Sequence, residues 1–157
     1  MGLIIRKYRR RDRHRIMEIT QEAFDGVSVD SLIERGFGRV ADTSWQQRRA
    51  TSVDYDLEAN PEQTLVAEQD GEVVGYVCAR LYRQYLIGHV ANLAVAPEHQ
   101  GQGIGRALLE ACLGAFREAG MKYARVETLD SNERGQRLYP SAGFREVARQ
   151  IHYFMEL

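Results

Sequence analysis

The spacing of apolar residues changes along the chain, and each change marks an expected element. Residues 64–83, "TLVAEQDGEVVGYVCARLYR", predict two strands joined by a tight turn at Asp70-Gly71. The apolar run "YLIGHVANLAVAP" predicts a strand over 86–96 that Pro97 closes. Residues 103–119 place apolar side chains with a period of 3.6 and stop at Gly120, so they predict an amphipathic helix.

The remaining segments are patterned less regularly. "LIIRKY" predicts an opening strand, followed by a helix over 12–24 with Asp12 as its N-cap. Residues 29–52 are helical in composition but are interrupted at Gly36 and Gly38, and 57–63 predicts a loop. Three closing elements are expected: a strand over 122–129, a short helix over 130–139 capped by Asp130, and β structure over 143–157.

This order combines antiparallel hairpins with one β-α-β crossover. It predicts an α/β fold with a mixed, mostly antiparallel central sheet flanked by helices. The length of 157 residues, without internal repeats or linkers, predicts a single domain over 1–157.

Composition narrows the class of protein. A net charge of −1 and the absence of a long apolar run give no reason to expect a nucleic acid or membrane partner. Residues 6–15 hold seven Lys or Arg, which a strand-to-helix junction explains better than a nucleic-acid-binding arm. Two cysteines point to a reducing, cytoplasmic setting, and the scattered histidines indicate no metal site.

The stretch "PEHQGQGIG" places glycines at 101, 103 and 105, directly before the predicted helix over 103–119. The first amides of a helix lack partners within it, and glycines let that backbone wrap a phosphate closely. The spacing matches neither GxxxxGK[ST] nor GxGxxG. A purely structural turn remains the alternative to an anion-binding site.

Gln100-Gly101-Gln102-Gly103-Ile104-Gly105 resembles the Q/R-x-x-G-x-G/A signature of GNAT-type N-acetyltransferases. Downstream, "NERGQRLYPSAGF" is similar to the family pattern N-x-x-A-x-x-L-Y-x-x-x-G-F, with Gly135 in place of the usual Ala. The opening "IIRKYRRRDRHRIMEI" also resembles the first strand and helix of that family. The resemblance implies a GNAT-like acyl-CoA N-acyltransferase fold and acetyl-CoA as co-substrate.

The resemblance also implies roles for individual residues. The pyrophosphate would be held by the signature loop, which comprises Gln100, Gly101, Gln102, Gly103, Ile104, Gly105 and Arg106. The main chain of Leu93 and Val95 would bond to the pantetheine and the acetyl carbonyl. Asn132 would hydrogen-bond the cofactor arm, and Tyr139 would lie near its sulfur.

Amine acetylation requires a proton acceptor, because an alkyl ammonium is almost fully protonated at pH 7. His89 lies four residues before Leu93, and strand alternation predicts it on the same side as Leu93 and Val95. A histidine that merely lines a cleft is the alternative, and Glu127 and Glu133 are acidic alternatives. Tyr139 is the candidate acid for the leaving thiolate. Pro140 is expected to end the helix at that tyrosine.

We therefore predict an N-acetyltransferase that acts by direct transfer in a ternary complex. A covalent acetyl-cysteine intermediate is not expected, because the apolar surroundings of Cys78 and Cys112 predict buried thiols that do not act as nucleophiles. A protein or peptide amine is the first acceptor hypothesis, because we expect the short closing stretch over 143–157 to leave the acceptor groove open on that side. Asp25, Asp30, Asp54, Asp56 and Glu58 could attract a cationic amine or form a solvated face. The alternatives are a polyamine, amino acid or aminoglycoside acceptor, or a non-catalytic acyl-CoA-binding sensor. Exposed edge strands are compatible with a homodimer.

Overall fold

A computed structural model describes residues 2–157 and contains one five-stranded sheet in the order β1-β2-β3-β4-β5. The strands are β1 (Ile4–Lys7), β2 (Thr64–Gln69), β3 (Glu72–Tyr82), β4 (Ile87–Val95) and β5 (Tyr123–Val126). The pairs from β1 to β4 are antiparallel, and β5 lies parallel to β4. The predicted mixed, mostly antiparallel sheet is confirmed.

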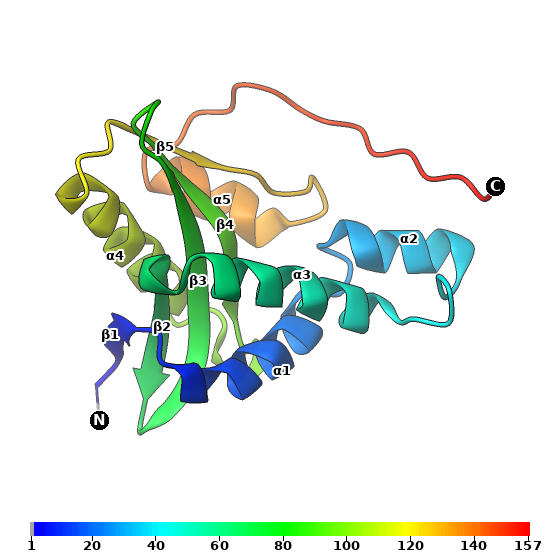
Figure 1. Cartoon of the computed structure of the whole chain (residues 1–157), viewed down its shortest axis with the longest axis horizontal. Helices are drawn as coiled ribbons and strands as arrows, with labels where there is room; N and C mark the ends of the chain where they lie inside the picture. The colour runs from blue at the N-terminus through cyan, green and yellow to red at the C-terminus, as the bar shows by residue number, and fades with distance from the viewer. Residues whose placement is uncertain (1) are drawn as a thin grey trace.

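Helices cover both faces of the sheet (Figure 1), and an apolar cluster lies on each side of it. The helices are α1 (Arg13–Ala23), α2 (Val29–Phe37), α3 (Trp45–Ala59), α4 (Ile104–Glu118) and α5 (Glu133–Ser141). One cluster joins α1 and α3 to the sheet, and the other joins α4 to its opposite face. Gly88 permits the second contact, because a Cβ there would lie 2.4 Å from the Phe116 ring of α4. No helix within residues 2–157 combines the length and apolarity needed to cross a bilayer.

Turn and cap residues between 29 and 71 decide where the helices and strands of this part of the chain begin and end. Asp70 and Gly71 have φ values of 52° and 81°, so the tight turn between β2 and β3 is confirmed. The segment 29–52 forms two helices, because Gly38 ends α2 with φ 77° and Ser44 caps α3. The loop predicted over 57–63 is shorter than expected, since Leu57 stays helical to pack in the core.

The last helix differs from its prediction at both ends. Its N-cap is Asn132, whose Oδ1 accepts a hydrogen bond from the Gly135 N–H, and not Asp130. It also continues through Pro140 to Ser141. A proline in the last turn removes only one N–H, while Ala142 N–H still donates to the Leu138 carbonyl. Tyr139 therefore keeps its helical position.

The β structure expected over 143–157 is wrong for this chain. Gly143 adopts φ 105°, and residues 145–157 then leave the body as an extended tail that runs toward α2 (Figure 1). The rings of Phe154 and Phe37 meet edge to face at 4.9 Å. Within residues 2–157, the tail has the sequence pattern of a strand but pairs with no strand of the sheet.

Candidate active site

The glycine loop presents open backbone amides at the start of α4. Gly101 and Gly103 have φ values of 77° and 82°, and a Cβ at either position would meet nothing within 4 Å. The N-cap of α4 is Gly103, so no N-cap side chain accepts a hydrogen bond from the first amides of the helix. Within the described residues 2–157, no hydrogen bond uses the N–H groups of 101–106. These donors lie at the positive end of the helix dipole and suit a phosphate group.

Beside this loop, β4 has a free edge. β5 pairs with β4 only at Ile87–Val90, so the two strands part before Ala91. The Ala96 N–H donates to the Val74 carbonyl of β3. Because successive residues of a strand direct their main-chain groups to alternate edges, those of Val95 and Leu93 face away from β3, toward the side of β5. An extended ligand could bond to this edge as a strand does.

A bulge in β4 changes which side chains share a face. The register with β3 shifts at Ala91, because Cys78 faces Asn92 while Ala79 faces Val90. Val90, Leu93 and Val95 belong to the α4 side, whereas Ala94 belongs to the α1 and α3 side. His89 lies with Asn92 on the α3 side. The prediction that His89 shares the face of Leu93 and Val95 is therefore wrong.

The bulge is fixed from α3 by a buried polar network that the sequence did not reveal. Asn92 donates to Oδ2 of Asp56 over 2.7 Å and accepts from the Arg49 guanidinium over 2.7 Å. Asp56 also accepts from Arg80. The available signal was an asparagine within an apolar strand, since a buried amide needs partners.

This network forms one wall of a polar pocket of about 170 Å³ that also contains His89 and Glu127. Nε2 of His89 lies 2.9 Å from Oε2 of Glu127, and Nδ1 is buried without a hydrogen-bond partner. The tautomer with its hydrogen on Nε2 leaves no buried N–H unpaired, so His89 donates to the Glu127 carboxylate. The Glu127 side chain is 57% exposed and receives a second hydrogen bond from Arg125.

Tyr139 lies on the other side of the sheet from His89. It packs on the cluster beneath α4, and its ring meets that of Phe144 edge to face at 5.9 Å. Burial raises the pKa of the Tyr139 phenol to about 12. Within residues 2–157, no hydrogen bond engages its hydroxyl. The phenol therefore stays protonated at neutral pH and remains available as a donor.

Several predicted binding residues use their side chains to support the loop. Gln100 donates to the Val95 carbonyl over 3.0 Å, and Gln102 makes a longer contact to the Glu98 carbonyl. The Arg106 guanidinium binds Oγ and the carbonyl of Ser141, which links α4 to α5. Ile104 is a core residue, so only its backbone amide can serve a ligand. A Cβ added at Gly105 would make ordinary van der Waals contact with Leu93, Val95 and Leu138.

Asn132 is likewise engaged within the chain. Its Oδ1 caps α5, and its Nδ2 donates to Thr128 Oγ1 over 2.8 Å. A Cβ at Gly135 would lie 2.8 Å from Nδ2 of Asn132 and 2.8 Å from Oγ1 of Thr128. An alanine at this position would require the side chains of Asn132 and Thr128 to shift.

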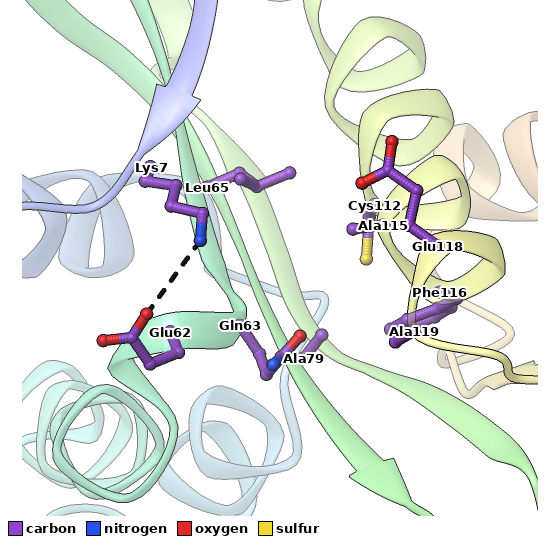
Figure 2. Close-up of a pocket in the computed structure, with 10 residues that line it drawn as sticks. All are labelled: Lys7, Glu62, Gln63, Leu65, Ala79, Cys112, Ala115, Phe116, Glu118 and Ala119. Carbon is purple, nitrogen blue, oxygen red and sulfur yellow. Dashed lines mark ion pairs between the residues drawn. The ribbon is translucent and has the colours of Figure 1, made fainter.

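A second pocket, of about 260 Å³, lies between β1, β2, β3 and the C-terminal half of α4 (Figure 2). Alanines 79, 115 and 119 and Cys112 contribute to its lining, and an exposed Lys7–Glu62 ion pair lies at its edge.

Burial raises the pKa of the Cys112 thiol to about 12, and that of Cys78 to a similar value. Both cysteines are therefore poor nucleophiles.

The arrangement of strands, loop and helices agrees with comparisons to known proteins. Residues 14–144 match the sequence model described as the Acetyltransferase (GNAT) family. The chain belongs to this family. The resemblance drawn from the glycine signature and the Asn132–Phe144 motif is thus confirmed, and the helices and mixed sheet are those of a GNAT fold.

Two relatives and one solved structure show the range of similarity. The chain is 36% identical over 102 residues to an N-alpha-acetyltransferase from Sulfurisphaera tokodaii, covering 58% of this chain and 61% of that protein. It is 34% identical over 145 residues to an uncharacterized N-acetyltransferase from Methanocaldococcus jannaschii, covering 92% and 79%. A GNAT acetyltransferase from Brucella melitensis, solved with acetyl-CoA, is 27% identical with a TM-score of 0.63, covering 92% and 84%.

Proposed function

We propose that the protein is an N-acetyltransferase that moves the acetyl group of acetyl-CoA directly to a primary amine in a ternary complex. The observation that carries this proposal is the free edge of β4 at Leu93 and Val95 beside the open amides of 101–106. The edge suits an extended amide-containing arm, and the amides suit a pyrophosphate. Acetyl-CoA contains both groups in one molecule.

The residues present fit this co-substrate. The backbone from Gly101 to Arg106 would hold the pyrophosphate, with Gln100 and Arg106 keeping the loop in place. The N–H groups of Leu93 and Val95 would bond to the arm and the thioester carbonyl, because the Val95 carbonyl is already taken by Gln100. Asn132 would act by fixing the start of α5, which carries Tyr139.

The pair of His89 and Glu127 would accept the proton that the amine loses as its nitrogen bonds to the acetyl carbon. Glu127 is the more accessible member, and His89 orients it through the 2.9 Å hydrogen bond. Both side chains face the polar pocket on the α3 side. An amine in that pocket would approach the thioester through the gap between β4 and β5.

Tyr139 would serve the departing sulfur from the α4 side of the same gap. When the carbon–sulfur bond breaks, the electron pair stays on sulfur, and the protonated phenol donates a hydrogen bond to it. A pKa of about 12 makes full proton transfer to a thiolate unfavourable, so the hydrogen bond itself supplies the stabilisation.

The charges favour a peptide or protein amine over a polycation. Four of the acidic residues expected to attract a cation are paired internally: Asp25 with Arg35, Asp30 with Arg48, Asp54 with Arg13 and Asp56 with Arg80. A polycation such as a polyamine or an aminoglycoside is recognised best by carboxylates that are free to pair with it. The name of the Sulfurisphaera tokodaii relative, an N-alpha-acetyltransferase, points the same way.

A panel of acceptors tests this proposal through release of the CoA thiol. The panel contains a peptide with a free N-terminus, the same peptide with a blocked N-terminus and a lysine, a polyamine, an amino acid and an aminoglycoside. We expect turnover with the free peptide N-terminus above the other acceptors. Preference for the polyamine or aminoglycoside would contradict the charge argument. Binding of acetyl-CoA without turnover of any amine would instead identify an acyl-CoA-binding sensor.

A further inference from the structure

Arg49 of α3 is a cation in the polar pocket, and no carboxylate of the chain pairs with it. Within residues 2–157, no ion pair engages its guanidinium, and its one side-chain hydrogen bond goes to the neutral amide oxygen of Asn92. Its Nε atom is buried without a hydrogen-bond partner. A buried donor without a partner is destabilising, and a guanidinium carries five N–H donors. Arg49 therefore has both the charge and the spare donors to bind an anionic group.

Two contacts hold this guanidinium in place at the wall of the pocket. Its Cζ lies 4.3 Å from the centroid of the Phe24 ring, and Nη2 lies 2.7 Å from the Asn92 oxygen. A side chain that is already ordered loses little conformational freedom when it binds a ligand. The planar fork of arginine also matches the two oxygens of a carboxylate. Arg49 is thus prepared to bind a carboxylate in particular.

The other charged groups of the pocket are balanced. Asp56 pairs with Arg80, and Glu127 pairs with Arg125, so each of these carboxylates already has its own cation. Among these described groups, Arg49 leaves the pocket with one net positive charge. A pocket of this sign attracts an acceptor that carries a negative group.

The pocket places its cation and its proton acceptor on different elements. α3 runs across the sheet (Figure 1) and contributes Arg49, Ser52 and Asp56 from one helix face, whereas Glu127 follows β5 in the chain. The volume of about 170 Å³ is smaller than the roughly 300–1,000 Å³ of sites for drug-sized ligands. It suits a single residue of an acceptor, with its amine at Glu127 and an acid group at Arg49.

We propose that the acceptor pocket selects an amine whose own residue carries a carboxylate side chain, and that Arg49 is the residue that recognises it. This inference rests on the proposed acetyltransferase activity, and it narrows the acceptor to a peptide that begins with aspartate or glutamate. The α-amine of the first residue faces Glu127, its side-chain carboxylate pairs with Arg49, and the rest of the peptide extends outside the pocket. Charge-assisted hydrogen bonds make this pairing stronger than the contact of a neutral side chain.

Three peptides that differ only in their first residue test the selection through release of the CoA thiol. They begin with aspartate, asparagine or lysine, and the first two have nearly the same shape. We expect kcat/KM for the aspartyl peptide to exceed that for the asparaginyl peptide about tenfold, and the lysyl peptide to be the poorest acceptor. Free aspartate carries the same two groups. Faster turnover of free aspartate than of the aspartyl peptide would overturn the assignment to a peptide.

Substitutions at Arg49 assign the preference to its charge. Arg49→Gln keeps an amide donor for Asn92 and should remove the preference for aspartate over asparagine, whereas Arg49→Lys should retain most of it. The matched control is Arg48→Gln, because Arg48 is the neighbouring residue of α3, pairs with Asp30 and does not line the pocket. A loosened strand would slow both peptides alike, so the ratio of their rates isolates the charge. No preference in the unaltered chain, or a preference that survives Arg49→Gln, would overturn the proposal.

Equilibrium binding separates this inference from the proposed activity. Calorimetry measures the affinity of the CoA-loaded protein for the acetylated aspartyl and asparaginyl peptides, and circular dichroism establishes that each variant keeps the fold. We expect tighter binding of the aspartyl product to the unaltered chain and equal binding of both products to Arg49→Gln. This result without turnover of any peptide would contradict the proposed activity and leave the role of Arg49 intact. Turnover with equal rates and equal affinities for both peptides would overturn the role of Arg49 alone.

Discussion

At the scale of single residues, burial and hydrogen-bond partners separate roles that residue type leaves open. His89 was the sequence candidate for the base, but one ring nitrogen is sealed and the other binds Glu127. Glu127 was predicted only as an alternative, and its exposed carboxylate now makes it the better-placed acceptor of a proton. The partner of the His89 ring lies 38 positions away in the sequence, and a single sequence does not show that contact.

Glu127→Gln is expected to lower kcat/KM about 100-fold, because the amide keeps the shape but cannot take the proton. The affinity for acetyl-CoA should stay unchanged. Glu133→Gln is the matched control, since Glu133 is the first residue of α5 and does not line the pocket that contains Glu127. Steady-state thiol release and calorimetry measure the two quantities. Equal losses in both variants would contradict the assignment.

Tyr139→Phe is expected to reduce kcat by about tenfold or more while leaving the KM for acetyl-CoA nearly unchanged. The substitution removes only the hydroxyl, and the ring can keep its contact with Phe144. Because burial raises the pKa of Tyr139 to about 12, the unaltered protein should show no loss of rate from this group between pH 7 and 10. An unchanged kcat in the phenylalanine variant would remove Tyr139 from the mechanism.

At the scale of elements, the sequence predicted the turns and helices that neighbouring residues determine, but not the features that depend on distant contacts. The turn between β2 and β3 and the helix after the glycine loop both follow from periodicity and turn residues. The bulge at Ala91 did not, because it is held by Asp56 and Arg49 from α3. Periodicity also misjudged the tail, since a strand pattern specifies the conformation but not the neighbour that completes it.

Two glycines in helices give opposite expectations at this scale. Gly135→Ala should destabilise the protein by about 1–3 kcal/mol, because its Cβ would displace the Asn132 cap. Gly114→Ala meets nothing within 4 Å in α4, and should stabilise by about 0.5–1 kcal/mol. Denaturant unfolding measures both. A neutral or stabilising Gly135→Ala would show that the cap is dispensable.

At the scale of the whole molecule, an ion pair links the first strand to the first helix. The Arg6 guanidinium binds both oxygens of Asp12, which is 5% exposed, and also reaches Glu68 of β2. Burial alone would raise the pKa of Asp12, but the hydrogen bonds from Arg6 and from the Arg9 N–H hold it below its usual value. A lowered carboxylate pKa stabilises the fold above the unfolded-state pKa.

Asp12→Asn should therefore cost about 2 kcal/mol near pH 7, because the neutral amide removes one of the two carboxylates that pair with the Arg6 guanidinium. This difference should shrink as the pH falls below about 4, because the unfolded chain takes up the proton on Asp12 first and the folded carboxylate follows only at lower pH. Urea unfolding across that pH range measures the difference. A gap that stayed constant into strong acid would show that the charge of Asp12 does not matter.

The central claim is that the glycine loop at the start of α4 binds the pyrophosphate of acetyl-CoA. Calorimetric titration of acetyl-CoA into the unaltered chain, Gly103→Glu and Gly120→Glu tests it most directly. Gly120 is the matched control, because it has nearly the same φ (81° against 82°) and equally open space, but lies beyond the opposite end of α4. We expect binding to the unaltered chain and to Gly120→Glu, and none to Gly103→Glu. Equal binding to all three proteins, or binding to none, would contradict the account.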